Sequence, residues 1–159
     1  MMTLLSAALA IGAQMQSPDG TFTAVTSDSR AIVTGDLFVA IKGDHFDGHA
    51  FVADAIKQGA AGALVSQEFA ASHPTLPLIA VADTRLALGA LAAAWRARFT
   101  LPLIGVTGSN GKTTVKEMCA AILHAQGGEV LATIGNLNND IDLPLTLLKL
   151  RDTHASAVI

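Results

Sequence analysis

A glycine-rich segment followed by a lysine and two threonines carries the strongest chemical signal in this sequence. Residues 107–114 read Thr-Gly-Ser-Asn-Gly-Lys-Thr-Thr. Gly108 and Gly111 allow the backbone to bend so that successive N–H groups point at phosphate oxygens. Lys112 supplies a positive charge for the β- and γ-phosphates, and the Thr113 hydroxyl is suited to bind Mg²⁺. The segment therefore predicts a loop for ATP and Mg²⁺, with Lys112 and Thr113 as catalytic residues and Thr113 as metal ligand.

The elements expected around this segment support that interpretation. Residues 103–106 form an apolar strand before it, and residues 130–132 form a strand after the helix that follows. This helix has four apolar residues on one face, namely Val115, Met118, Cys119 and Ile122. Strand, glycine-rich turn, Lys-Thr and helix occur in this order in phosphate-binding loops. The usual motif has a glycine at the position of Val106, so this loop is a variant, and a glycine turn that binds nothing is the alternative.

Two other polar segments lie in the first third of the chain. Asp28-Ser29-Arg30 follows a β-branched stretch, and by pattern alone it is a turn. The alternative is a substrate-contacting loop in which Arg30 pairs with a phosphate. Residues 43–49 contain Asp44, His45, Asp47 and His49, but no third His or Cys is near, which disfavours a metal site. Three further histidines have no partner at a useful spacing and are expected at the surface: His73, His124 and His154.

Composition excludes several classes of protein. The chain has 159 residues, of which 51% are hydrophobic and 14% charged, and its formal net charge is −3. Such a chain is too apolar to be disordered and too acidic to bind nucleic acid through a broad basic surface. Residues 1–18 contain no basic side chain, and polar residues interrupt them, so a secretory signal and a membrane span are both disfavoured. With Cys119 as its single cysteine, the chain is expected to be cytoplasmic.

Alternating strand and helix patterns predict an α/β fold. The elements expected in the first part are strands over residues 36–41, 63–65 and 76–81, and helices over residues 51–58 and from Asp83 or Thr84 onward. Leu88, Leu91 and Trp95 recur at helical spacing, which places Trp95 in the core. Thr100–Pro102 separates this pattern from the phosphate-loop pattern. We therefore expect two domains, residues 1–99 and residues 100–159.

The glycine-rich segment also resembles a known sequence, because residues 107–118 are similar to the ATP-binding loop of the Mur ligases. Residues 26–30, 35–40 and 43–51 resemble the amino-terminal domain of that family, which holds the uridine nucleotide of the substrate. Residues 136–141 and 144–148 resemble the stretch after the second strand of its ATPase domain. Asp142 stands where the family has glycine, and it could cap the helix that follows. The resemblance covers essentially the whole chain, which corresponds to the amino-terminal portion of a longer three-domain enzyme.

The resemblance implies a small amino-terminal α/β domain followed by the incomplete start of a phosphate-loop ATPase α/β domain. It implies ATP and Mg²⁺ as cofactors, bound by Gly108, Ser109, Asn110, Gly111, Lys112, Thr113, Thr114, Asn138 and Asn139. It further implies that the first domain binds the UDP-sugar substrate through Ser27, Asp28, Ser29, Arg30, Gly43, Phe46, Asp47, Gly48 and His49. Residues 43–49 would then lie over the UDP-sugar.

Within the family, residues 109–110 and 115–118 resemble the branch that joins D-alanyl-D-alanine to UDP-MurNAc-tripeptide through an acyl phosphate. That branch makes a peptidoglycan precursor, and its complete enzyme is expected to be a monomer. The 159-residue chain is expected to be inactive by itself, because the family's acidic Mg²⁺ ligand and third domain come after Ile159. Three alternatives remain open: a sister ligase that adds a different amino acid, a non-catalytic nucleotide-binding fragment, and a plain phosphate-loop nucleotidase.

Overall fold

The computed structural model describes residues 1–16, 19–43, 46–135 and 139–159. It divides into two compact units, Met1–Leu91 and Ala92–Ile159. Each unit combines a mainly or wholly parallel sheet with helices, which confirms the predicted α/β class. Within the described residues, every helix is too short or too polar to cross a membrane.

The first unit is built on a five-stranded sheet. The strand order is β2 (Gln14–Gln16), β7 (Leu78–Val81), β6 (Gly62–Ser66), β5 (Asp36–Val39) and β4 (Ala24–Thr26). Strands β4 to β7 are parallel, and β2 is antiparallel to β7 at one edge. A separate antiparallel pair joins β1 (Met2–Thr3) to β3 (Thr21–Phe22). The carboxyl ends of β4 and β5 lead into the two polar segments singled out from the sequence.

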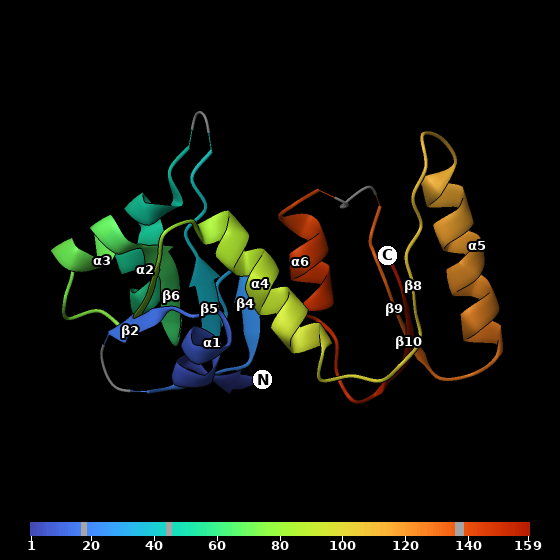
Figure 1. The fold of residues 1–159 in the computed structure, drawn as a ribbon, viewed down its shortest axis with the longest axis horizontal. Coiled ribbons are helices and arrows are strands. Elements are labelled where there is room, and N and C mark those ends of the chain that lie inside the picture. Colours follow the sequence, from blue (N-terminus) through green and yellow to red (C-terminus); the bar gives the residue numbers. More distant parts are fainter. Residues whose placement is uncertain (17–18, 44–45, 136–138) are drawn as a thin grey trace. The chain divides into compact units, whose positions relative to one another are not determined.

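Helices cover both faces of this sheet (Figure 1). They are α1 (Leu4–Ala10), the 3₁₀ helix η1 (Gly48–Phe51), α2 (Val52–Lys57), α3 (Gln67–Ser72) and the start of α4 (Thr84–Arg96). Because successive strand residues point to opposite faces, Phe38 and Ala63 pack toward α2, while their neighbours Leu37 and Leu64 are buried on the other face. The sheet is therefore apolar on both sides, as parallel sheets usually are.

The second unit contains a three-stranded parallel sheet, ordered β8 (Leu103–Ile104), β10 (His154–Val158) and β9 (Glu129–Ala132). Helix α5 (Lys112–Ala125) packs on it, and Ala120 contacts Val130 and Val158. The shorter helix α6 is Asp142–Leu147. Trp95 is buried as predicted, and its indole N–H donates to the carbonyl of Leu150 at 3.1 Å.

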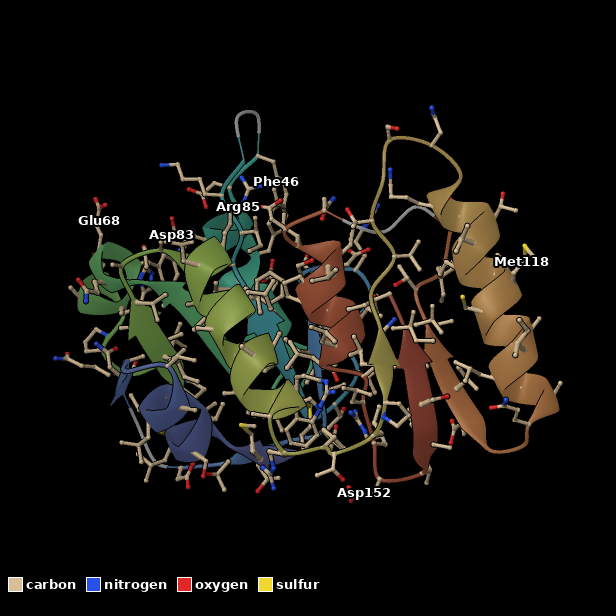
Figure 2. The ribbon with its side chains drawn as sticks, turned by 45° about the vertical axis from the view of Figure 1, so that its right-hand side comes forward. Phe46, Glu68, Asp83, Arg85, Met118 and Asp152 are labelled. Carbon is tan, nitrogen blue, oxygen red and sulfur yellow. The ribbon has the colours of Figure 1, made fainter. Side chains whose placement is uncertain are left out.

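Of the four residues on the predicted apolar face of α5, only Cys119 packs against the core that Ala120 forms with the sheet. The side chains of Val115, Met118 and Ile122 are 47%, 60% and 58% exposed, and Met118 points away from the sheet in Figure 2. The buried residues of the helix are Lys116 and Ala120. The hydrophobic pattern failed here because Lys116, a charged residue, finds hydrogen-bond acceptors at the sheet and is buried with them.

Two smaller expectations are also wrong. Strand β8 ends at Ile104 instead of Val106, because the chain turns toward the glycine-rich segment, although the N–H of Val106 still donates to the carbonyl of Ile159 at 2.7 Å. His154 is not at the surface, since its side chain is 9% exposed and its Nδ1 accepts the N–H of Arg151 at 3.0 Å. Strand β2 and helix α3 were not predicted, because both are short.

Candidate functional site

The glycine-rich segment forms an open turn at the start of α5. Gly108 and Gly111 have φ angles of +149° and +76°, which side chains disfavour, so both positions need glycine. Gly111 is the N-cap of α5 and supplies no side-chain cap. The N–H of Val115 donates to the carbonyl of Gly111 at 2.9 Å, so the N–H groups of the first turn, from Lys112 to Thr114, point out of the start of the helix. These donors and the positive end of the helix dipole form a site for an anion such as phosphate.

The side chain of Lys112 folds back over this turn. Its Nζ donates to the carbonyl oxygen of Gly108 at 2.6 Å, which holds the ammonium group at the glycine-rich turn. Lys112 and Thr113 line a cavity together with Val106, Lys116, Thr133, Gly135 and Ile159. The structure therefore brings the predicted cation and the predicted metal ligand to one cavity, where an ammonium, a hydroxyl and backbone N–H groups suit a nucleotide phosphate and its Mg²⁺.

Of the two asparagines predicted to bind the nucleotide, Asn139 caps the start of α6. Asn138 lies outside the described residues. The Oδ1 of Asn139 accepts the N–H groups of Ile141 and Asp142 at 2.9 and 2.7 Å, at the start of α6. The side-chain cap expected from Asp142 is thus supplied by Asn139, because an Asn oxygen two or three residues upstream reaches these donors. Asp142 is instead the first residue of the helix, where a carboxylate is favourable.

A compact ion pair shapes the Asp28-Ser29-Arg30 turn. Asp28 accepts the N–H of Arg30 at 3.0 Å, and its two oxygens accept Nε and NH2 of the guanidinium at 2.9 and 2.8 Å. The side-chain hydrogen bond from Arg30, supported by its backbone N–H, lowers the pKa of Asp28 to about 2. Both side chains are largely exposed. The pair holds the guanidinium in one orientation at the carboxyl end of β4.

This turn and the predicted loop of residues 43–49 meet at one cavity, the Arg30 cavity. It is lined by Ser27, Asp28, Ser29, Arg30, Phe46 and Phe51. The rings of Phe46 and Phe51 are stacked with their centroids 5.5 Å apart, and Phe46 is 50% exposed. Exposed aromatic rings beside a fixed guanidinium suit a ligand that has a flat ring and a phosphate. Phe51 was not predicted as a site residue, because its place in an expected helix made it look like a core residue.

Three other predicted loop residues have structural contacts. His49 accepts the N–H of Ser66 on Nε2 at 3.0 Å, so its proton is on Nδ1 and is donated to Asp47 at 2.6 Å. The backbone N–H of His49 first, and then its ring, lower the pKa of Asp47. A Cβ on Gly48 would lie 2.9 Å from the backbone N and O of Ile41. These residues fix the start of η1 against β6.

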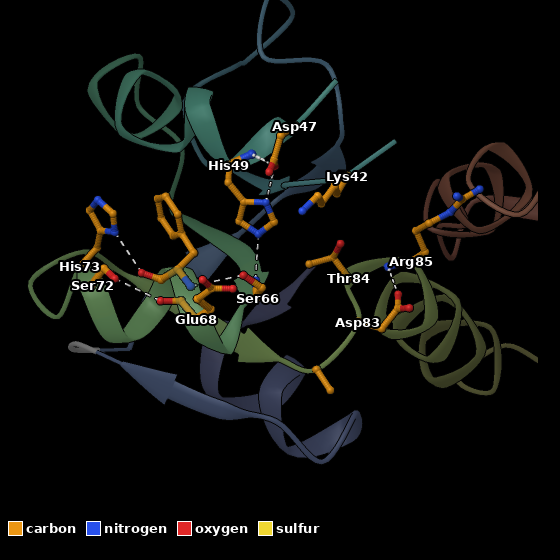
Figure 3. Close-up of a pocket in the computed structure, with 12 residues that line it drawn as sticks. Lys42, Asp47, His49, Ser66, Glu68, Ser72, His73, Asp83, Thr84 and Arg85 are labelled. Carbon is orange, nitrogen blue, oxygen red and sulfur yellow. Dashed lines mark hydrogen bonds and ion pairs between the residues drawn. The ribbon is translucent and has the colours of Figure 1, made fainter. Parts of the chain in front are cut away.

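A second cavity lies on the other side of these contacts (Figure 3). Asp47 and His49 line it with Lys42, Glu68, Asp83 and Arg85, among others. The N–H of Gly43 donates to the carbonyl of Phe46 at 2.8 Å, which closes the base of the predicted loop, and Asp44 and His45 lie outside the described residues. The structure thus places Phe46 at the Arg30 cavity but Asp47 and His49 at this one, so the nine predicted substrate residues do not share a single cavity.

Residues from both units match descriptions of one known protein family. Residues 21–96 match the description "Mur ligase family, catalytic domain", and residues 106–159 match "Mur ligase middle domain". The chain belongs to the Mur ligase family. The resemblance stated from the glycine-rich segment is therefore confirmed, and the two matches separate between residues 96 and 106.

Individual Mur ligases are similar over nearly the whole chain. UDP-N-acetylmuramoyl-tripeptide–D-alanyl-D-alanine ligase of Escherichia coli K12 is 49% identical over 152 residues, which are 94% of this chain and 32% of that protein. The crystal structure of MurF from Acinetobacter baumannii superposes with a TM-score of 0.83 at 38% identity, covering 99% of this chain and 35% of that one. MurF ligase from Thermotoga maritima in complex with ADP gives 0.72 at 32% identity, covering 85% and 31%. The chain thus spans about a third of the length of these relatives.

The cavity lined by Lys112 and Thr113 is called the phosphate-loop cavity. Two other polar residues that line it, Lys116 and Thr133, were not predicted as site residues. Lys116 follows Lys112 by four positions, so helical periodicity could have placed both on one face of α5. Thr133 follows an apolar strand, and a polar residue at the carboxyl end of a parallel strand is a known signal for a ligand site. Neither signal showed that the two residues meet, because they are 17 positions apart along the chain.

Proposed function

We propose that this chain is the substrate-binding and ATP-binding front part of a ligase that joins D-alanyl-D-alanine to UDP-MurNAc-tripeptide. The observation that carries the proposal is the open phosphate loop at the start of α5, with Lys112 folded over it, in a Mur ligase chain. The name of the Escherichia coli relative supports the choice of substrates, and the ADP complex of the Thermotoga maritima relative supports an adenine nucleotide as ligand.

The two units would divide the work. Residues 1–99 would bind the uridine nucleotide at the Arg30 cavity, where the guanidinium pairs with the diphosphate and the rings of Phe46 and Phe51 contact the base. Residues 100–159 would bind ATP at the phosphate loop. This division agrees with the different chemistry of the two places: aromatic rings and a guanidinium at one, helix-start N–H groups and an ammonium at the other.

At the phosphate loop, the residues of this chain would position and neutralise charge. Bound Mg²⁺–ATP supplies the phosphoryl group that activates the carboxylate of the peptide substrate. Lys112 would exchange the carbonyl of Gly108 for phosphate oxygens, while the N–H groups of the first turn of α5 fix the orientation of the phosphates. The Thr113 hydroxyl would be the metal ligand from this chain. Phosphoryl transfer needs little else from a protein than such positioning and charge stabilisation.

Amide chemical shifts of the chain test the proposed division. UDP-MurNAc-tripeptide is expected to shift the amides of residues 27–30, 46 and 51, and Mg²⁺–ATP those of residues 108–114. Shifts from the UDP ligand at the phosphate loop, or no shift from either ligand, would contradict the proposal.

The choice of acceptor needs a chain extended through the family's remaining domains. Phosphate release from ATP and UDP-MurNAc-tripeptide is expected with D-alanyl-D-alanine and not with single amino acids. Release with a single amino acid instead would identify a sister ligase.

A further inference from the structure

Lys116 is a buried charge beside the phosphate loop. Its side chain is 6% exposed, and it lies one helical turn after Lys112. Its Nζ donates to the carbonyl oxygens of Thr133 and Gly135 and lies 2.7 Å from a carboxylate oxygen of Glu117. An ammonium group has three N–H donors, so these three acceptors account for all of them. Burial of the charge is therefore compensated, and the end of β9 is held against α5.

Unlike the ammonium group of Lys116, the hydroxyl of Thr133 is buried without a hydrogen bond among the described residues. The residue is 5% exposed, and its Oγ1 is buried without a hydrogen-bond partner among the residues that the structure describes. A buried hydroxyl without a partner destabilises a fold, so such a group calls for an explanation. Thr133 lines the same cavity as Lys112 and Thr113. An unsatisfied polar atom is thus kept at the place where the phosphate loop would hold its ligand.

We propose that Thr133 is a further binding residue of the nucleotide site and that Lys116 is its positioning residue. This inference rests on the proposed function. The Thr133 hydroxyl gains its hydrogen bond from an oxygen of the bound Mg²⁺–nucleotide, either a phosphate oxygen or a metal-bound water. Lys116 holds the backbone of residues 133–135, so the hydroxyl stays at the cavity that Thr113 also lines. The free chain bears the cost of the unpaired hydroxyl, and the ligand removes it.

The first test is Thr133→Val, which removes the hydroxyl and keeps the shape of the side chain. We expect the melting temperature of the free chain to stay the same or rise, while the Kd for Mg²⁺–ADP, measured by calorimetry, rises about tenfold, as for loss of a hydrogen bond to a charged ligand. Thr146→Val is the matched control, because Thr146 is also buried in this unit but does not line the cavity. Its Kd is expected to be unchanged.

A binding role and a structural role of the Thr133 hydroxyl predict different changes in melting temperature and in Kd for Thr133→Val. If Thr133→Val lowers the melting temperature and leaves the Kd unchanged, the hydroxyl serves the fold and the proposal is overturned. An unchanged Kd with a higher melting temperature overturns it as well. If the unsubstituted chain does not bind Mg²⁺–ADP, the proposed function itself fails. Repeating the titrations with EDTA separates the two partners, since an effect through metal-bound water is lost and one through phosphate remains.

The positioning role is tested by a double-substitution cycle with Lys116→Met. If Lys116 acts by holding Thr133, the tenfold effect of Thr133→Val should fall to less than twofold in the Lys116→Met background. Lys149→Met removes an exposed lysine of the same unit and should leave the tenfold effect intact. Equal effects of Thr133→Val in both backgrounds would overturn the role of Lys116. If Lys116→Met does not fold by circular dichroism, Lys116→Gln, which also removes the ammonium group, replaces it in the cycle, and the Thr133→Val effect should again fall to less than twofold.

Discussion

The Arg30 cavity and the phosphate loop differ in how their polar groups are satisfied before any ligand binds. At the Arg30 cavity, the guanidinium already has both oxygens of Asp28 as partners. At the phosphate loop, the N–H groups of the first turn of α5 point out of the start of the helix, and Lys112 has a backbone carbonyl that a phosphate would replace. The first place is organised by its own ion pair, whereas the second is arranged to gain hydrogen bonds from an anion. The Arg30 guanidinium is thus oriented by Asp28 in advance, whereas the phosphate loop presents an ammonium group and N–H groups that an anion can approach.

Both units bury large apolar side chains, and both leave others exposed. Large side chains such as Phe38 and Leu64 are fully buried in the five-stranded sheet. In the second unit, Leu148 and Leu150 are buried, while α5 leaves three large apolar side chains exposed. Binding free energy adds to the stability of whichever state binds the ligand. Under the proposed division of ligands, Mg²⁺–ADP should raise the stability of the second unit and UDP-MurNAc-tripeptide that of the first.

Among the substitutions that test this comparison, Lys112→Ala should have the largest effect on ligand affinity. It removes the ammonium group and leaves the N–H donors, so the affinity for Mg²⁺–ADP should fall at least a hundredfold, which is about 2.7 kcal/mol. Lys149→Ala, at an exposed position, is the control and should bind normally. Calorimetry measures both. Unchanged binding by Lys112→Ala would mean that charge does not dominate at the phosphate loop.

Gly48→Ala tests the structural role of the other region. The added methyl group would meet the backbone of Ile41 at 2.9 Å, so the first unit should lose about 2 kcal/mol of stability, as in other overpacked sites. Gly89→Ala places a methyl group in open space within α4 and should be neutral or stabilising. Chemical denaturation measures both. Equal stability of the two variants would contradict the close approach at Gly48.

Arg30→Ala should separate the two sites by ligand. Loss of the guanidinium should weaken binding of UDP-MurNAc-tripeptide about tenfold, or about 1.4 kcal/mol, and leave Mg²⁺–ADP binding unchanged. Titration with each ligand in turn shows the difference. A loss of Mg²⁺–ADP affinity of the same size would refute the division of ligands between the units.

The smallest expected effect is the pH dependence of the Asp28–Arg30 pair. The folded-state pKa of Asp28 is lowered from 3.8 to about 2, so the ionised form stabilises the turn above pH 3.8. That contribution is lost as the pH falls from 3.8 toward 2. Both side chains are exposed, so the change in overall stability should be slight. A carbon-detected NMR titration should find a pKa near 2, and Arg30→Ala should return it toward 3.8.

The nature and order of the elements could be predicted because they depend on local signals. The motif at Gly108–Thr113 requires a turn that only glycine adopts easily, and the apolar pattern around Leu88 and Trp95 requires a buried helix face. The resemblance to the Mur ligases rests on contiguous segments such as residues 107–118, so the sequence was enough to establish the family. Asp28 and Arg30, two positions apart, also belong to one local turn.

Tertiary structure decided which distant residues share a cavity. Phe51 joins Arg30 because η1 follows β5, and Asp47 and His49 face another cavity because His49 accepts the N–H of Ser66. Lys116 is buried only because the end of β9 presents carbonyl oxygens to it. In each case the decisive partner is at least 17 positions away in the sequence. Periodicity describes which face a residue occupies, but the hydrogen bonds that make burial of a charge possible exist only once the strands and helices have packed.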